Sequence, residues 1–307
     1  MIAPARELQV AGRTLEVGPR PWLMGIVNAS PDSFSDGGMR PDLEAQVALA
    51  SELAEAGAEI LDVGGESATT GSPPVPVELE IERVVPLIER AAGELGVLVS
   101  VDTYKPAVAR AAISAGASIV NDVSGLRDPA LADLCAQTGA GLVVMHTRAA
   151  PRQRLQQDDL YSDVVDEVLA FLRERISLAL ARGVALTQLI VDPGPDFAKT
   201  PAQTIELLGG LDRLHELGRP LLMAISRKDF IGALTGRAPR ERLAGTLAAL
   251  AYGVDRGAHI FRVHDVAAAA DFLTVRAALE GEVAVERSLA LSDQLRHERL
   301  GADRGAR

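Results

Sequence analysis

The sequence predicts a single α/β domain folded as a (β/α)8 barrel, the TIM barrel, and two observations support this. Eight short apolar runs each end on a polar residue, and parallel strands buried on both faces have this continuous Val/Ile/Leu character. The eight end residues are Asn28, Asp62, Asp102, Asn121, His146, Asp192, Ser226 and Arg262. Consecutive ends lie between 19 residues (Asp102 to Asn121) and 46 residues (His146 to Asp192) apart, so every interval has room for a return helix. Catalytic groups of such barrels lie at the carboxyl ends of the strands, which makes these eight positions the predicted active-site rim.

The elements follow in order from the amino terminus. Residues 6–18 alternate around Ala11-Gly12, which predicts a small hairpin that acts as a plug or flap at the amino-terminal end of the barrel. The strand at 22–27 then pairs with a helix over 43–56, which has apolar residues at helical spacing and stops at Gly57. Further helices are predicted at 78–95, 105–115, 128–138, 160–182, 201–215, 239–256 and 265–280. The domain limits are predicted as a hairpin or extension (1–20), the barrel (21–282) and a polar tail (283–307).

Composition narrows the class of protein. The chain has 307 residues, 48% of them hydrophobic and only 3% aromatic, as expected for one barrel with an aliphatic interior. A net charge of −11 argues against nucleic-acid binding, which needs a basic face. No apolar run approaches ~18 residues and the amino terminus lacks a signal-peptide pattern, so neither a membrane span nor a secretory leader is expected. The single cysteine, Cys135, is expected to be a packed thiol, which fits the reducing cytoplasm.

Two long loops follow predicted strands at the rim. Residues 28–41 are rich in Ser, Asp, Pro and Gly and include Phe34, and residues 64–77 are rich in Gly, Pro, Ser and Thr. Long loops at this end of a barrel are typical of lids and binding loops. Motifs for zinc-hydrolase, serine-hydrolase and P-loop chemistry are absent from the sequence.

Polar strand ends predict the kind of ligand. Asp102, Asn121 and Asp192 are each able to cap a helix or hold a loop, but together they offer acceptors and a donor at one mouth. A flat heterocycle with an aminopyrimidinone edge fits that set. His146 fits either this site or the core.

A second group of strand ends is cationic. Ser226-Arg227-Lys228 follows the seventh strand and Arg262-x-His264 ends the eighth. Isolated Arg and Lys side chains are usually solvated, but phosphate sites in barrels often follow strands seven and eight. We therefore expect an anion, such as a phosphate group, to bind here.

Taken together, the motifs resemble those of dihydropteroate synthases, the folate-pathway members of the pterin-binding barrel family. They are LMGIVNASPDSFSDGG (23–38), DVGGES (62–67), VSVDTYKPAVAR (99–110), IVNDVSG (119–125), VVMH (143–146), DPGPDFAKT (192–200), ISRKDFIG (225–232) and FRVHDV (261–266). The resemblance implies condensation of 6-hydroxymethyl-7,8-dihydropterin pyrophosphate with p-aminobenzoate to give 7,8-dihydropteroate and pyrophosphate. It also implies Mg²⁺ beside the pyrophosphate, a homodimer that uses the helix near 241–254, and no nucleic-acid or membrane partner.

The resemblance assigns roles residue by residue. Asp102, Asn121, Asp192 and Lys228 match pterin-holding positions, and Arg262 and His264 match pyrophosphate positions, with Asn28 at the Mg²⁺ position. Ser226, Phe197 and Lys228 match the p-aminobenzoate side, and Phe34 matches the first loop. The catalytic residues are then Asp102, Lys228 and Arg262, while Asp62 and His146 are left as scaffolding.

The sequence departs from the family pattern in two places. Residues 68–71 (Ala-Thr-Thr-Gly) stand where a Thr-Arg-Pro-Gly run is usual, so an arginine that contacts pyrophosphate is missing, and Arg148 or Arg152 is a candidate replacement. The usual Gly-rich stretch after DPG is replaced by residues 195–200, which brings Asp196 towards an anionic substrate. Two alternatives therefore accompany the synthase: a pterin-binding paralogue without synthase activity and with a regulatory role, and, less favoured, a methyltetrahydrofolate methyltransferase.

Overall fold

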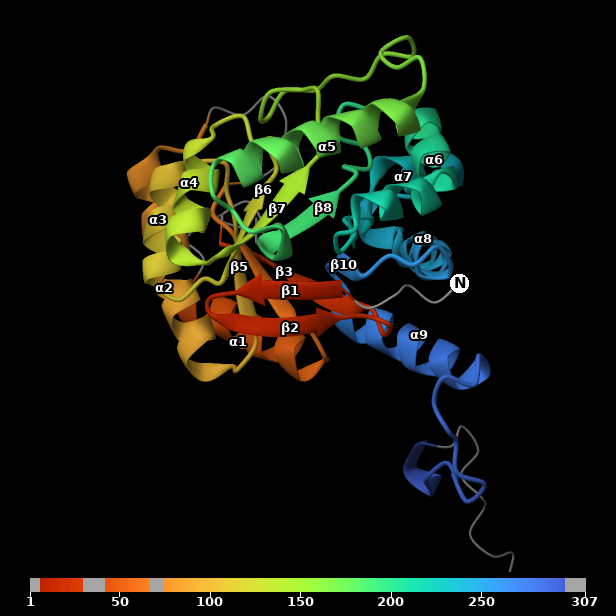
Figure 1. Cartoon of the computed structure of the whole chain (residues 1–307). Coiled ribbons are helices and arrows are strands. Elements are labelled where there is room, and N and C mark those ends of the chain that lie inside the picture. Colours follow the sequence, from red (N-terminus) through yellow and green to blue (C-terminus); the bar gives the residue numbers. More distant parts are fainter. Residues whose placement is uncertain (1–5, 30–41, 67–73, 296–307) are drawn as a thin grey trace, which may run out of the picture. The chain divides into compact units, whose positions relative to one another are not determined.

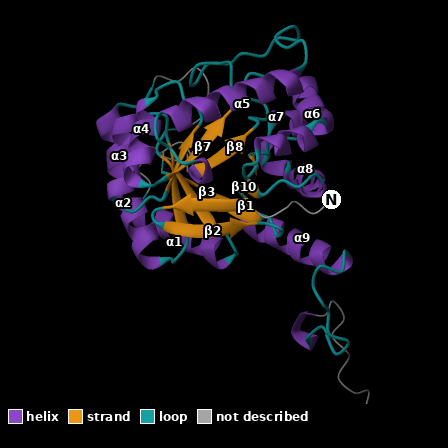
Figure 2. Cartoon of the chain, in the orientation of Figure 1, coloured by secondary structure: helices purple, strands orange, loops and turns teal. Residues whose placement is uncertain are grey.

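Eight parallel strands form a barrel in the computed structural model, which describes residues 6–29, 42–66 and 74–295. The strand order β8-β7-β6-β5-β4-β3-β10-β9 follows the chain around the barrel, and a parallel bridge between Val191 and Leu221 closes β8 onto β9. Helices cover the outside of this sheet (Figure 1, Figure 2). The predicted (β/α)8 barrel is confirmed.

The element bounds are as follows. The barrel strands are β3 (Trp22–Asn28), β4 (Ile60–Gly64), β5 (Leu98–Asp102), β6 (Ile119–Asp122), β7 (Gly141–Met145), β8 (Leu189–Asp192), β9 (Leu222–Met223) and β10 (Ile260–Val263). The α-helices are α1 (Leu43–Glu55), α2 (Val77–Glu94), α3 (Pro106–Ser114), α4 (Ala130–Thr138), α5 (Val164–Ala181), α6 (Pro201–Gly209), α7 (Asp229–Thr235), α8 (Leu243–Asp255) and α9 (Val266–Leu279). Short 3-10 helices are η2 (Leu186–Gln188), η3 (Leu211–Leu217), η4 (Pro239–Glu241) and η5 (Asp293–Leu295).

Local capping explains where the helices depart from the predicted limits. α5 starts at Val164 rather than 160, because the Asp163 side chain caps it by accepting from the Asp166 backbone N–H at 2.8 Å. The predicted helix 201–215 is divided at the glycine pair that ends α6, and η3 continues the path. The short helix α7, the next element after β9, was not predicted.

The amino-terminal hairpin closes one end of the barrel. β1 (Arg6–Val10) and β2 (Arg13–Val17) pair antiparallel, and Leu8, Val10 and Val17 are completely buried. They share one hydrophobic cluster with residues that begin barrel strands, including Ile60, Leu98, Ile119, Leu222 and Ile260. The predicted plug is confirmed, and the carboxyl-terminal rim is left as the end that can admit a ligand.

The chain divides into two compact units, residues 1–270 and 271–307, with the boundary inside α9. Within the described part of the second unit, Arg276 pairs with Glu282 at 3.3 Å, and Val283, Leu289 and Leu295 are exposed. The predicted limits at 20/21 and 282/283 stay predictions. Among the described residues, no helix combines the length and hydrophobicity needed to cross a bilayer.

Candidate active site

Strand register brings four sequence-distant positions to one level of the rim. Asn28 pairs with Gly64, Gly64 with Asp102, and Asp102 with Asn121, so one row crosses β3, β4, β5 and β6. A methyl group placed on Gly64 would lie 3.9 Å from Asp102 Oδ2 and 4.0 Å from Asn28 Oδ1. The two oxygens therefore face the same small space, which the absent side chain of Gly64 keeps open.

Arg262 on β10 joins the carboxylates of this region across the barrel. Its Nε donates to Asp62 Oδ2 at 2.6 Å and its Nη2 donates to Asp102 Oδ2 at 2.8 Å. Asn121 Nδ2 donates to the same Asp62 oxygen at 3.0 Å. We call Asp62, Asp102, Asn121 and Arg262 the floor cluster. Asp62, expected to be scaffolding, is completely buried at its centre and holds both Arg262 and Asn121.

In the floor cluster, Asp62 and Asp102 share the guanidinium of Arg262, and burial makes the ionised form of Asp102 less favourable. Burial raises the pKa of Asp102, the Arg262 guanidinium opposes this, and the Asp62 carboxylate adds to it. For Arg262, burial lowers the pKa, but the attraction of Asp62 and Asp102 outweighs it and the pKa is raised. Arg262 therefore stays charged, and the Asp102 carboxyl is poised to respond to a nearby positive charge.

A second group lies around β8 and the start of α7. Asp192 is buried and its Oδ1 accepts from the Gly194 N–H at 2.7 Å. Burial raises the pKa of Asp192 to about 6, although the Gly194 N–H and Lys228 oppose the shift. Lys228 Nζ lies 4.2 Å from the centre of the Phe197 ring, within the range of a cation–π contact. The predicted residues Phe197 and Lys228 are thus adjacent.

Ser226 and His264 are hydrogen-bonded to each other. His264 Nδ1 lies 3.0 Å from Ser226 Oγ, which also accepts from the His264 backbone N–H at 3.2 Å. Burial lowers the pKa of His264 to about 4, so its imidazole is neutral near pH 7. Arg227, expected to bind an anion, is instead held by Asp265 in two hydrogen bonds of 2.8 and 3.2 Å.

Lys199 is a site-adjacent residue that sequence reasoning missed. Its side chain is completely buried, and Nζ lies 2.8 Å from His146 Nδ1, 2.9 Å from the Gly194 oxygen and 3.0 Å from the Phe197 oxygen. Burial lowers the pKa of Lys199 to about 7. Burial, followed by the charge of Lys199, lowers the pKa of His146 to about 2. His146 is therefore a buried neutral partner of Lys199, and the lysine ties the Phe197 loop to β7.

Lys199 should make stability depend on pH in a window that is unusual for lysine. The unfolded chain takes up the Lys199 proton at about 10.5 and the folded chain at about 7. Between these values the unfolded state binds more protons, so stability rises with pH. From pH 7 to 9 the gain should be roughly 2–3 kcal/mol. Urea unfolding at pH 7, 8 and 9 should show the free energy of unfolding rising with pH in the wild type and staying nearly constant in Lys199→Met. The same pH dependence in both proteins would contradict the role given to Lys199.

Glutamates hold both arginines that the sequence offered as replacement phosphate ligands. Arg152 Nη1 donates to Glu66 Oε1 at 2.7 Å, and Arg148 pairs with Glu167. Lys105 Nζ contacts Glu66 Oε2 at 2.5 Å. Both arginines considered as replacement phosphate ligands are therefore held by glutamates. Phe34 and residues 68–70 lie outside the described residues.

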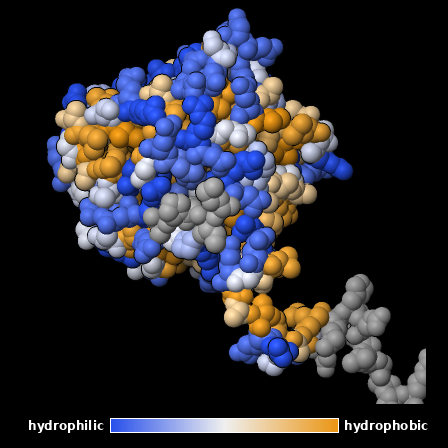
Figure 3. Space-filling view, turned by 45° about the vertical axis from the view of Figure 1, so that its right-hand side comes forward, coloured by the Kyte–Doolittle hydropathy of each residue, from blue (hydrophilic) through white to orange (hydrophobic). Residues whose placement is uncertain are grey.

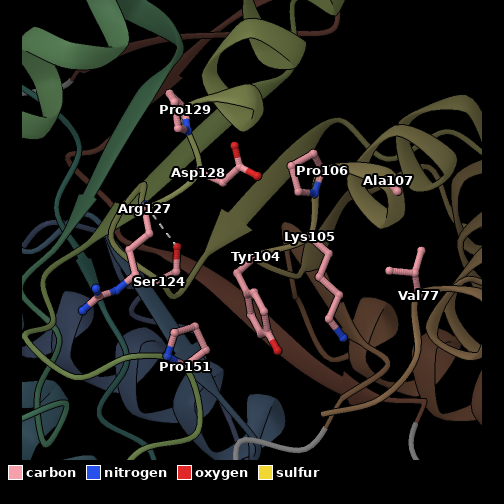
Figure 4. A pocket seen from close by; sticks show the side chains of 10 residues that line it. All are labelled: Val77, Tyr104, Lys105, Pro106, Ala107, Ser124, Arg127, Asp128, Pro129 and Pro151. Carbon is pink, nitrogen blue, oxygen red and sulfur yellow. Dashed lines mark hydrogen bonds between the residues drawn. The ribbon is translucent and has the colours of Figure 1, made fainter.

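A separate cavity of about 610 Å³ opens on the same rim (Figure 4). Figure 4 shows side chains from the β5–α3, β6–α4 and β7–α5 loops around it, with the Arg127 N–H bonded to Ser124 Oγ at 3.4 Å. Its lining consists of Val77, Tyr104, Lys105, Pro106, Ala107, Ser124, Arg127, Asp128, Pro129 and Pro151. None of the predicted site residues lines this cavity.

Known proteins resemble this chain over most of its length. The family described as pterin binding enzymes matches residues 24–264. The chain is 38% identical to the dihydropteroate synthase of Escherichia coli K12 over 292 residues, which is 95% of this chain and 100% of the relative. It is 47% identical over 251 residues to a probable bifunctional folylpolyglutamate synthase/dihydropteroate synthase of Haloferax volcanii. That match covers 80% of this chain and 30% of the longer relative.

A solved structure extends the comparison to three dimensions. The dihydropteroate synthase of Xanthomonas albilineans in complex with 7,8-dihydropteroate has a TM-score of 0.80 and 47% identity, covering 89% of this chain and 98% of that one. The two proteins therefore share the barrel fold, and the sequence similarity extends over nearly the whole of both chains. The chain belongs to the dihydropteroate synthase family of pterin-binding enzymes.

Proposed function

We propose that this chain is a dihydropteroate synthase, a transferase of folate biosynthesis that joins p-aminobenzoate to 6-hydroxymethyl-7,8-dihydropterin pyrophosphate. The relative from Escherichia coli carries this name, and the Xanthomonas structure holds 7,8-dihydropteroate. The observation that carries the proposal is the floor cluster, in which Arg262 bridges Asp62 and Asp102. Lys228, which contacts the Phe197 ring, is close enough to interact electrostatically with Arg262.

Asp102, Asn121 and Asp192 are proposed to hold the pterin. Asn121 and Asp192 are buried and Asp102 lies at the rim, so the three side chains offer two carboxyl groups and an amide to a flat ring. A pterin presents N–H donors and ring acceptors along one edge, and this set can satisfy both kinds. Lys228 adds a donor on the side of Phe197. Buried and pre-oriented groups of this kind discriminate strongly against ligands that leave them unpaired.

Arg262 and His264 are proposed to hold the pyrophosphate. A guanidinium has five N–H donors and two of those of Arg262 bond to carboxylates, so others are available for phosphate oxygens. Within the described residues, no group of three or more His, Cys, Asp or Glu side chains could hold a metal ion. Mg²⁺ is commonly bound by one or two protein oxygens together with substrate phosphates, and the Asn28 Oδ1 above Gly64 fits that need. When bound, Mg²⁺ supplies charge neutralisation of the pyrophosphate.

The proposed reaction needs no enzyme nucleophile. The bond between the exocyclic pterin carbon and the pyrophosphate oxygen breaks, and the pyrophosphate leaves with the electron pair while Arg262 and His264 donate to it. The positive charge left on the pterin is delocalised, and Asp102 and Asp192 stabilise it electrostatically. The p-aminobenzoate nitrogen then forms the new C–N bond and loses a proton. The contribution of Asp102, Lys228 and Arg262 is thus binding, orientation and charge.

Ser226, Phe197 and Lys228 are proposed to form the p-aminobenzoate side. Phe197 offers a ring face to the aromatic substrate, and Lys228 and the Ser226 hydroxyl offer polar contacts near it.

One assay tests the proposed function. The purified protein is incubated with the pterin pyrophosphate, Mg²⁺ and p-aminobenzoate, and pyrophosphate and dihydropteroate are followed together. Equal amounts of both products are expected. Pterin binding without either product would overturn the synthase proposal and favour the paralogue that only binds pterin; growth of a synthase-deficient strain provides an independent check.

We further propose a cytoplasmic homodimer. Cytoplasmic location rests on the single buried cysteine, which suits a reducing compartment. The dimer rests on α8, where Ala244, Ala248 and Tyr252 recur at four-residue spacing and are exposed, with Leu243 beside them. Figure 3 shows hydrophobic residues interspersed among hydrophilic ones on the face turned forward.

Substituting Ala248 by arginine should convert the dimer to a monomer. The charged side chain would lie between Ala244 and Tyr252 on the proposed interface, where burying it without an oppositely charged partner is costly. Light scattering after size-exclusion chromatography should give a mass near the 32.3 kDa of one chain for Ala248→Arg and twice that for the wild type. Gln137→Arg on the exposed face of α4 is the matched control and should stay dimeric. A wild-type monomer would refute the dimer.

A further inference from the structure

The loop between β8 and α6 has two side chains where its backbone favours glycine. Asp196 has φ of 64° and Ala198 has φ of 52°, both in the left-handed region that residues with a Cβ rarely adopt. Such a conformation persists only where surrounding contacts hold it in place. Asp196 has such contacts with two neighbouring elements.

The Asp196 carboxylate is completely committed to two neighbouring elements. Its Oδ2 accepts from the backbone N–H groups of Asp229 at 2.5 Å and Phe230 at 3.3 Å. Its Oδ1 accepts from the Thr204 hydroxyl at 3.0 Å, and the Asp196 N–H donates to the same Thr204 oxygen at 3.1 Å. The acid is thus turned towards α7 and α6, and not towards an incoming anion as the sequence suggested.

These bonds supply what α7 lacks in its own sequence. The residue at its N-cap is Lys228, whose side chain has no acceptor and makes no capping bond. The first N–H groups of a helix need an outside partner, and a carboxylate is the best placed group by charge as well. Asp196 provides that partner from a different loop.

The same bonds connect two of the three residues proposed to hold p-aminobenzoate, Phe197 and Lys228. Phe197 follows Asp196 directly, and Lys228 precedes Asp229 directly. Asp196 thus bridges the two segments at the point where Lys228 Nζ lies 4.2 Å from the Phe197 ring centre. On the other side of Phe197, Lys199 binds the Phe197 carbonyl at 3.0 Å. The ring is anchored from both sides along the chain.

We propose that Asp196 is a positioning residue that latches the Phe197 loop to the start of α7 and so preforms the p-aminobenzoate side of the site. This inference rests on the proposed synthase function and identifies which residue holds one of its two substrate sites. It assigns Asp196 no contact with substrate.

The Asp196 carboxylate also affects the pKa of Lys228, and this effect depends on its charge rather than on its hydrogen bonds. Burial lowers the pKa of Lys228, and the Asp196 carboxylate is the largest influence that opposes it, followed by Asp192. The other charges that face Lys228 are Arg262, which lowers its pKa, and Asp229, which raises it. Loss of the Asp196 charge alone should therefore shift the titration of Lys228 to lower pH without moving the loop.

The test compares Asp196→Gly with Asp196→Asn. Glycine removes the latch but suits the left-handed backbone, so the fold should be kept. The KM for p-aminobenzoate should rise about tenfold, whereas the affinity for the pterin pyrophosphate, measured by calorimetry, should fall by less, because Asp102, Asn121 and Asp192 are untouched. Asparagine keeps an acceptor for the α7 N–H groups, so it should retain a KM near wild type and shift the alkaline limb of the pH–kcat/KM profile to lower pH. Asp212→Asn, an exposed acid on η3, is the charge-matched control.

A readout independent of activity completes the design. The backbone amides of Asp229 and Phe230 should exchange hydrogen faster in Asp196→Gly than in the wild type, but not in Asp196→Asn. If the wild type is active but Asp196→Gly changes neither the KM for p-aminobenzoate nor the hydrogen exchange, the positioning role of Asp196 is overturned and the proposed function is not. An inactive wild type would overturn the proposed function, while faster exchange in Asp196→Gly would still support the structural link.

Discussion

Replacing Asp102 by alanine is expected to lower kcat by at least about 100- to 1000-fold, the range for loss of one pre-oriented electrostatic group. Asp102 is the last residue of β5 and lies in one row with Asn28, Gly64 and Asn121 at the rim. In the proposed reaction it stabilises the positive charge that develops on the pterin, and this interaction is stronger in the transition state than in the ground state.

Steady-state dihydropteroate formation at saturating substrates measures the effect. Asp102→Asn should also be strongly impaired, because it keeps the shape but removes the charge that opposes the developing cation. Asp271→Asn, an exposed acid, is the control and should match the wild type. Unchanged turnover in Asp102→Ala would remove the electrostatic role given to this residue.

Replacing Arg262 by methionine should abolish turnover and also destabilise the fold by roughly 3–5 kcal/mol. The variant would leave Asp62, which is completely buried, and Asp102 without their cation. Removing one partner of a buried ion pair costs far more than the pair contributes, because the remaining charge cannot be solvated. Urea unfolding midpoints measure the loss.

A second variant separates the two effects of Arg262. In the double variant Asp62→Asn with Arg262→Met, the completely buried charge of Asp62 is removed together with its cation. Asn121 can still donate a hydrogen bond to the new amide oxygen. A large part of the lost stability should return while activity stays absent, because the proposed pyrophosphate contact is still missing. If Arg262→Met were as stable as the wild type, the floor cluster would not be held together by this ion pair.

The barrel could be predicted from the sequence because its signals are local. Apolar runs that end on polar residues, with one helix length between them, allow few arrangements other than parallel strands around a common axis. The hairpin at 6–18 was equally readable, since its alternation and the Ala11-Gly12 turn are both local. The short helix α7 was not readable, because its start is capped by Asp196 from another loop.

The candidate site was readable in part, and the missing part consists of contacts across the barrel. Strand ends such as Asp102, Asn121 and Asp192 could be chosen because the carboxyl ends of parallel strands meet. Asp62 was treated as scaffolding, although it lies between Arg262 and Asn121. Lys199 gave no signal, since a lysine in a polar loop is normally exposed and only packing decides that it is buried against His146.

The sequence by itself determined the strand period, the positions of the strand ends and the resemblance to a pterin-binding family, because each of these depends on residue type and spacing along the chain. The tertiary structure alone decided the partners: Arg262 with Asp62 and Asp102, Arg227 with Asp265, and Asp196 with the start of α7. These pairs join residues that are 33 or more positions apart. Barrel closure and strand register determine which charged side chains come into contact. Both depend on several distant segments together, so they cannot be deduced from any one segment.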